Sequence, residues 1–127
     1  MSSVVLNDNR WKVETGGLWR WLWSMIIRDV EYSNWLVTDK KTDETWRLTS
    51  QEQTFLSDIA ERVNAVQFAP EFQNQSKTER KRLSQLALAD CLGAIALSRQ
   101  GDSSKMENLA GLNQPELTAY VFALWGL

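Results

Sequence analysis

Hydrophobic residues recur every three to four positions through the second half of the chain, a spacing typical of amphipathic helices. This pattern predicts helices over about 50–68, 77–99, 105–110 and 114–125. Each predicted helix opens on a capping-box pattern, in which Ser, Thr or Asn is followed three residues later by Glu. The four patterns are Thr49–Glu52, Ser76–Glu79, Ser104–Glu107 and Asn113–Glu116. One such pattern is weak evidence, but four of them, each opening an apolar-periodic segment, indicate helices.

The predicted helix over 77–99 differs from the others because its middle, residues 86–97, is apolar almost all the way round. The same stretch is rich in small residues, which allow neighbouring helices to pack closely. We therefore expect this helix to be the central one. The single charged residue of the stretch is Asp90, which shares a helix face with four apolar residues: Leu83, Leu86, Ala94 and Leu97.

A tryptophan-rich segment precedes these helices. Its three closely spaced tryptophans are Trp19, Trp21 and Trp23. Their alternation resembles a strand, but Arg20, Ser24 and Arg28 are spaced four residues apart and form one narrow polar stripe on an otherwise apolar helix. The segment therefore predicts a helix over about 17–31.

Residues 32–48 hold two apolar stretches on either side of a polar run at 39–44. This arrangement suits a β-hairpin, although we favour a helix end followed by a loop. Together the elements predict an all-α protein. It would be a single helical domain over 1–127, one compact bundle of about five helices, with a short hairpin around 33–48 as the alternative there.

Composition narrows the possible chemistry. The 127-residue chain has a formal net charge of −2 and no histidine, which excludes nucleophile–histidine pairs and every histidine-containing metal site. The single cysteine, Cys91, cannot form an internal disulfide or a cysteine-based zinc site. We recognise no signal peptide and no membrane-spanning stretch. We expect a reduced, cytoplasmic protein that is not an enzyme, binds no cofactor or metal and makes no contact with a membrane.

Asp90 needs a positively charged partner, because a carboxyl group among apolar residues otherwise stays protonated. The arginines expected to point inward are Arg20 and Arg28. We therefore predict an ion pair between Asp90 and one of them, which would lock the tryptophan helix onto the central helix. Removing Asp90 would then cost roughly 3 kcal/mol of stability.

The densest cluster of positive charge, which we call the basic start, lies in the first turns of the helix over 77–99. Its members are Lys77, Arg80, Lys81 and Arg82. Cations are locally unfavourable at the positive end of the helix macrodipole, so helix stability does not explain them. One interpretation is a solvated polar helix end. The other is contact with the phosphates of single-stranded RNA or DNA, which would be weak, salt-dependent and independent of base sequence.

The small size, the five-helix layout and the basic residues at helix starts resemble the small helical subunits of CRISPR effector complexes. This resemblance implies a non-catalytic assembly subunit that contacts its own copies and supports the guide RNA and target strand through the basic start. The alternative is a protein-only interaction module, such as an inhibitor, an immunity protein or a chaperone. Such a module would dock its protein partner through the face formed by Trp19, Trp21 and Trp23.

Overall fold

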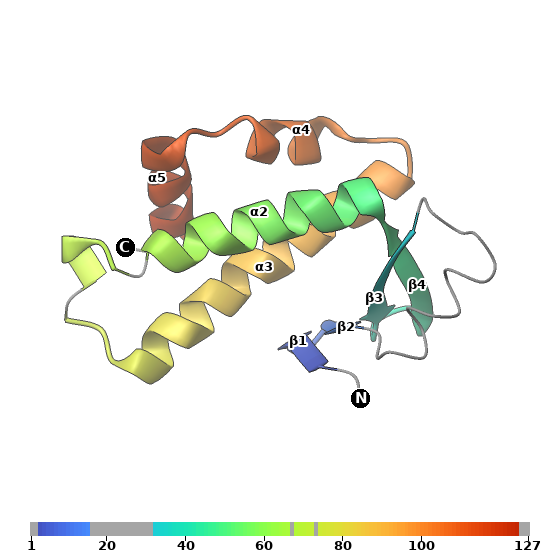
Figure 1. The fold of residues 1–127 in the computed structure, drawn as a ribbon, viewed down its shortest axis with the longest axis horizontal. Coiled ribbons are helices and arrows are strands. Elements are labelled where there is room, and N and C mark those ends of the chain that lie inside the picture. The colour runs from blue at the N-terminus through green and yellow to red at the C-terminus, as the bar shows by residue number, and fades with distance from the viewer. Residues whose placement is uncertain (1–2, 16–31, 67, 73, 125–127) are drawn as a thin grey trace. The chain divides into compact units, whose positions relative to one another are not determined.

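The computed structural model describes residues 3–15, 32–66, 68–72 and 74–124. Within these residues the chain is α+β, because a four-stranded antiparallel sheet precedes the helices (Figure 1). The prediction of an all-α bundle of about five helices is therefore wrong. The chain divides into two compact units, Met1–Thr54 and Phe55–Leu127. The single domain over 1–127 stays a prediction.

The first unit is built on strands β1 (Ser3–Asn7), β2 (Trp11–Thr15), β3 (Tyr32–Asp39) and β4 (Glu44–Thr49). They lie in the sheet in chain order, and each is antiparallel to its neighbours. The sequence of β2, Trp-Lys-Val-Glu-Thr, shows why such a segment forms a strand. Apolar and polar residues alternate there with the period of two that sends successive side chains to opposite faces of a sheet.

The register of the strands gathers apolar side chains on one face of the sheet. Val13 of β2 stands opposite Val37 of β3, which in turn stands opposite Trp46 of β4. The buried hydrophobic residues of the strands are Leu6, Trp11, Val13, Val37 and Leu48. A shift of one residue would move this whole set to the other face, so burial fixes the register.

The segment around 33–48 is a hairpin, formed by β3 and β4. The favoured interpretation, a helix end followed by a loop, is wrong. Its turn at 40–43 contains Asp43 with φ of 61°, in the left-handed region that aspartate enters more readily than most residues. The polar run thus turns the chain between two half-buried strands.

Four α-helices follow in the described residues: α2 (Ser50–Val66), α3 (Lys77–Arg99), α4 (Ser104–Ala110) and α5 (Gln114–Leu124). A short 3-10 helix, η1 (Pro70–Phe72), lies between α2 and α3. These bounds lie within two residues of those predicted for 50–68, 77–99, 105–110 and 114–125, so the four helix predictions are confirmed. The helix predicted over 17–31 lies outside the described residues.

The capping patterns explain where these helices begin. At α2 the Glu52 amide donates to Thr49 Oγ1 at 3.1 Å, while the Thr49 amide donates to Glu52 Oε1 at 2.8 Å. Asn113 and Glu116 make the same reciprocal pair at α5, with both bonds at 2.9 Å. Each pair satisfies two backbone N–H groups that the helix itself leaves free.

The other two patterns are only partly realised. Ser76 caps α3 by accepting the Glu79 amide at 3.1 Å, but the Glu79 carboxylate turns to Arg82 instead of back to the cap. At α4 the box predicted at Ser104 does not form, because Ser104 is already helical. Its amide and hydroxyl donate to Asp102 Oδ1 at 3.2 and 2.7 Å.

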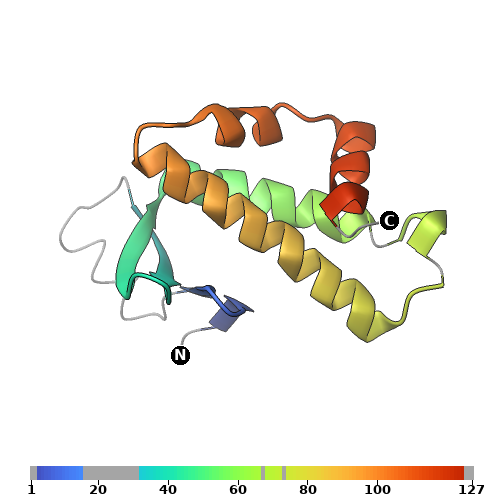
Figure 2. The same cartoon turned by 180° about the vertical axis from the view of Figure 1, so that it is seen from behind.

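The core of the second unit comes from all of its helices. All residues of the predicted stripe of α2 are buried: Phe55, Leu56, Ile59, Val63 and Val66. Phe72 of η1 packs against Phe122 of α5 with ring centroids 4.5 Å apart. Arg62 of α2 donates to the carbonyl of Leu112, before α5. In Figure 2, α3 crosses in front of α2, and no other described helix of this unit passes over its near side.

Candidate interaction surfaces

The basic start of α3 keeps only part of its positive charge free. Lys77 and Lys81 are exposed, and neither forms an ion pair in the described part of the chain. Arg82 donates to both carboxylate oxygens of Glu79, at 2.6 and 3.1 Å. That bond lowers the pKa of Glu79 and raises the pKa of Arg82, so both stay charged and neutralise one another. Arg80 is half-buried, and its Nε has no hydrogen-bond partner among the described residues.

Of the four residues of the basic start, Lys77 and Lys81 are therefore the two that carry an exposed charge without an ion pair among the described residues. Lys77 and Lys81 lie four residues apart, one above the other on a single helix face. A pair of lysines spaced by one helical turn can contact two neighbouring phosphates. Two such contacts would give far weaker binding than the four that the sequence suggested.

Asp90 has a partner that the sequence reasoning missed. Its Oδ1 accepts a hydrogen bond from Lys105 Nζ at 2.7 Å, between the middle of α3 and the first turn of α4. The side chains of Asp90 and Lys105 are 24% and 40% exposed, so the pair lies at the edge of the helical unit. The only sequence signal is Gly101, which ends α3 with φ of 102° and allows the chain to turn back.

The predicted partners of Asp90, Arg20 and Arg28, lie outside the described residues. The proposed docking residues Trp19, Trp21 and Trp23 do too, so these expectations stay predictions. Of the described tryptophans, Trp11 is buried and its ring meets that of Trp46 edge-on, with centroids 6.2 Å apart. This aromatic pair belongs to the apolar face of the sheet.

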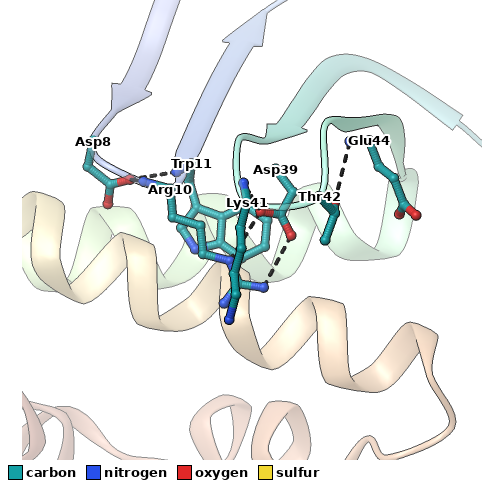
Figure 3. Close-up of polar contacts among 7 residues, drawn as sticks. All are labelled: Asp8, Arg10, Trp11, Asp39, Lys41, Thr42 and Glu44. Atoms are coloured by element: carbon teal, nitrogen blue, oxygen red, sulfur yellow. Dashed lines mark hydrogen bonds and ion pairs between the residues drawn. The ribbon is translucent and has the colours of Figure 1, made fainter.

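A polar cluster of the first unit joins its two described turns, and we call it the turn cluster: Asp8, Arg10, Asp39, Lys40 and Lys41. Arg10 Nε and Nη2 donate to the two carboxylate oxygens of Asp39 at 3.2 and 3.1 Å (Figure 3). The Lys41 amide donates to Asp39 Oδ1 at 3.0 Å. The Arg10 hydrogen bonds hold the pKa of Asp39 below its ordinary value. Asp39 is therefore a buried, ionised anchor for both turns.

The other residues of the turn cluster also hold the two turns through hydrogen bonds. Asp8 Oδ1 accepts the amides of Arg10 and Trp11 at 2.9 and 2.6 Å, which shapes the β1–β2 turn. The Arg10 guanidinium carbon lies 4.4 Å from the centre of a Trp11 ring. Lys40 Nζ reaches across to Asn7 Oδ1 and to the Asp8 carbonyl at 2.5 and 2.6 Å. These groups satisfy one another, so the cluster stabilises the sheet end and offers no open chemistry.

The most unusual surface of the second unit is one side of α3, which we call the α3 outer face: Leu86, Ala89, Gly93 and Leu97. Leu86 and Leu97 are 41% and 39% exposed, although they stand in the most apolar stretch of the chain. Ala89 and Gly93 between them are half-buried, and a methyl group added at Gly93 would have no atom within 4 Å. The face is thus apolar, low in relief and open.

The remaining candidates for chemistry are few. Cys91 is fully buried, and burial raises the pKa of its thiol to about 12, so it is protonated at neutral pH. Among the described residues no group of three His, Cys, Asp or Glu side chains is placed to hold a metal ion. No helix in those residues has both the length and the apolar character needed to cross a membrane.

Comparisons with protein families, with curated proteins and with solved structures find no match to this chain. The functional interpretation therefore depends on the surfaces just described.

Proposed function

We propose that this protein is a non-catalytic interaction module that docks a protein partner on the α3 outer face. The observation that carries the proposal is the exposure of Leu86 and Leu97, each about two-fifths, on the side of α3 that faces away from its buried residues. Exposed leucines are common singly, whereas two on one face with small residues between them form an apolar strip that suits a protein partner. A reduced thiol in the core agrees with the cytoplasmic location that we also propose.

A charged substitution at the centre of the proposed interface tests this function. The full chain carrying an affinity tag is purified from its native cells in three forms: the unchanged protein, Leu86→Arg and Leu124→Arg. Leu124 is a matched control because it is a leucine on α5 with a similar exposure, 37%. We expect the unchanged protein and Leu124→Arg to retain a stoichiometric partner that Leu86→Arg loses. Equal recovery of the same proteins with all three forms would overturn the proposal.

A second candidate function is contact with a nucleic-acid backbone, as the resemblance to CRISPR small subunits implies. The observation in its favour is that Lys77 and Lys81 present uncompensated charge at a helix end where such charge is locally unfavourable. The four-stranded sheet corrects the all-helical layout on which that resemblance depends. The paired state of Arg82 and the chain's net charge of −2 also make this function the less favoured of the two.

Salt-dependent binding separates the two functions. If the basic start contacts phosphates, purified protein binds single-stranded RNA or DNA at low salt, and Lys81→Glu abolishes that binding while Leu86→Arg leaves it unchanged. Each phosphate contact that is lost lowers the slope of log affinity against log salt by roughly 1. No binding at low salt would exclude the nucleic-acid function and leave the protein-docking one in place.

A further inference from the structure

The two exposed leucines of the α3 outer face are exchanged by a two-fold axis midway between them. Leu86 and Leu97 are eleven residues apart, which is three turns plus about 20°, so they lie on one side and about 16 Å from each other. The point midway between them along the helix is also midway between Asp90 and Gly93. A second copy turned through 180° therefore places its Leu97 against Leu86, and its Leu86 against Leu97. Such self-complementarity is the requirement of a two-fold interface.

The charges at the two ends of the face agree with the antiparallel arrangement. Arg82 lies one turn before Leu86, and Asp102 lies just beyond Leu97, whose carbonyl accepts the Asp102 amide at 3.0 Å. An antiparallel pair brings Arg82 beside the partner's Asp102 twice, once at each end. A parallel pair would instead place Arg82 beside Arg82 and Asp102 beside Asp102.

Both charged groups retain unused hydrogen-bonding capacity for this contact. Arg82 uses Nε and Nη2 on Glu79, so the two N–H groups of its Nη1 are free. Asp102 accepts both bonds from Ser104 on Oδ1, which leaves Oδ2. A new ion pair can therefore form without breaking the pair within α3 or the hydrogen bonds at the start of α4.

The centre of the face can also accept a second helix. Asp90 would otherwise bring like charges together across the two-fold axis, but Lys105 Nζ at 2.7 Å neutralises it. Gly93 carries no side chain and faces open space, so it gives room opposite the partner's Asp90. Small residues at such a crossing allow two helix axes to come within about 8–10 Å.

We propose that the partner of the α3 outer face is a second copy of this chain, paired with it through antiparallel α3 helices. This inference rests on the proposed function, since it names the occupant of the same docking face. It makes the protein a symmetric homodimer with Leu86 against the partner's Leu97.

Cross-linking between cysteine variants tests both the dimer and its direction. Leu86→Cys and Leu97→Cys are prepared separately, then mixed and exposed to a mild oxidant. The antiparallel pair predicts a disulfide-linked dimer in the mixture and none in either variant alone, because identical positions lie about 16 Å apart. Cys91 does not interfere because it is fully buried. Leu124→Cys replaces Leu86→Cys in the control mixture, which should give no linked dimer.

Sedimentation of the unmodified chain gives a second measurement. We expect twice the monomer mass for the natural protein. For Leu86→Arg we expect the dissociation constant of the dimer to rise by at least about tenfold. Arg82→Asp and Asp102→Arg should each weaken the dimer, and the double variant should restore it, because the exchange re-forms both ion pairs. Melting curves of each variant show that the fold is retained.

The outcomes distinguish a failure of the homodimer from a failure of the proposed docking function. A monomer at all concentrations, or a disulfide within either cysteine variant alone, overturns the antiparallel homodimer. If Leu86→Arg still loses a protein partner in native cells, the docking function stands with another occupant. If the purified chain is a monomer and all forms recover the same proteins, both proposals fail.

Discussion

Asp39 is the residue whose removal should most directly test the physical account of the sheet end. Asp39→Ala deletes an acceptor of two guanidinium bonds from Arg10 and one amide bond from Lys41. Hydrogen bonds to charged groups contribute about 1.5–3 kcal/mol when buried. Here the Asp39 side chain is 8% exposed but that of Arg10 is 44% exposed, so water partly replaces the lost partner. We expect a net loss of about 2 kcal/mol in the free energy of unfolding.

Urea unfolding measures this loss, and its pH dependence tests the cause. The Arg10 hydrogen bonds lower the pKa of Asp39 in the folded state, so the folded protein binds a proton there less readily than the unfolded chain. The contribution of Asp39 is therefore complete above its unfolded pKa of about 3.9, and it is lost as the pH falls through the lower, folded value. The difference between the natural protein and Asp39→Ala should be full at pH 7 and should shrink below about pH 4.

A neighbouring carboxylate gives the control. Glu44 lies in the same turn region, is exposed, and takes part in the cluster of Figure 3 only through its backbone amide. Glu44→Ala should change stability by less than about 0.5 kcal/mol. If Asp39→Ala costs no more than Glu44→Ala, or if its cost does not change with pH, the proposed role of the Arg10–Asp39 pair is refuted.

Three further measurements follow from the helical unit. Asp90→Ala should cost less than about 1 kcal/mol in thermal unfolding, because Lys105 is partly exposed and regains water; a loss near 3 kcal/mol would mean that Asp90 has another buried partner. Cys91 should react with an aromatic disulfide reagent at pH 8 only after unfolding, since its pKa is about 12, and rapid labelling of the native protein would contradict its burial. Asn113→Ala removes the acceptor of the Glu116 amide and should cost about 1 kcal/mol in urea unfolding; an unchanged midpoint would show that the cap does not contribute.

The helices could be predicted because their signals are local. A capping bond joins residues three positions apart, as between Asn113 and Glu116. The buried residues of α2 recur once in every helical turn. These short-range interactions already favour the helices before tertiary packing adds to their stability. The two boxes that are incomplete each meet a competing neighbour, since Arg82 binds the Glu79 carboxylate and Asp102 accepts the Ser104 amide.

The sequence offers the β3–β4 hairpin only as an alternative and gives no prediction for β1 and β2, because each strand is short and its hydrogen bonds come from another strand. A usable signal was present in β2, where Trp11 and Val13 alternate with Lys12 and Glu14 directly after turn-forming residues. Five residues of alternation are too few to outweigh a strong helical pattern elsewhere. Residues 11–15 form a strand because they pair with β1 on one side and with β3 on the other.

Among the candidate surfaces, the sequence located the basic start and Asp90 but could not assign their partners. Lys105 is the partner of Asp90 only because α4 folds back along α3 after Gly101. Likewise Leu86 and Leu97 are indistinguishable in the sequence from the buried Leu83 and Leu92. Which leucines face outward depends on where the other helices lie.

The helices of the second half and two of their complete caps follow from the sequence alone, and the composition excludes histidine chemistry and an internal disulfide. The sheet of the first half, the contact of Arg10 with Asp39, and the exposure of Leu86 and Leu97 follow only from the folded chain. The difference lies in the range of the interactions. Capping and helical periodicity act within about four residues, whereas strand pairing, ion pairs between elements and burial depend on segments that only the folded chain brings together.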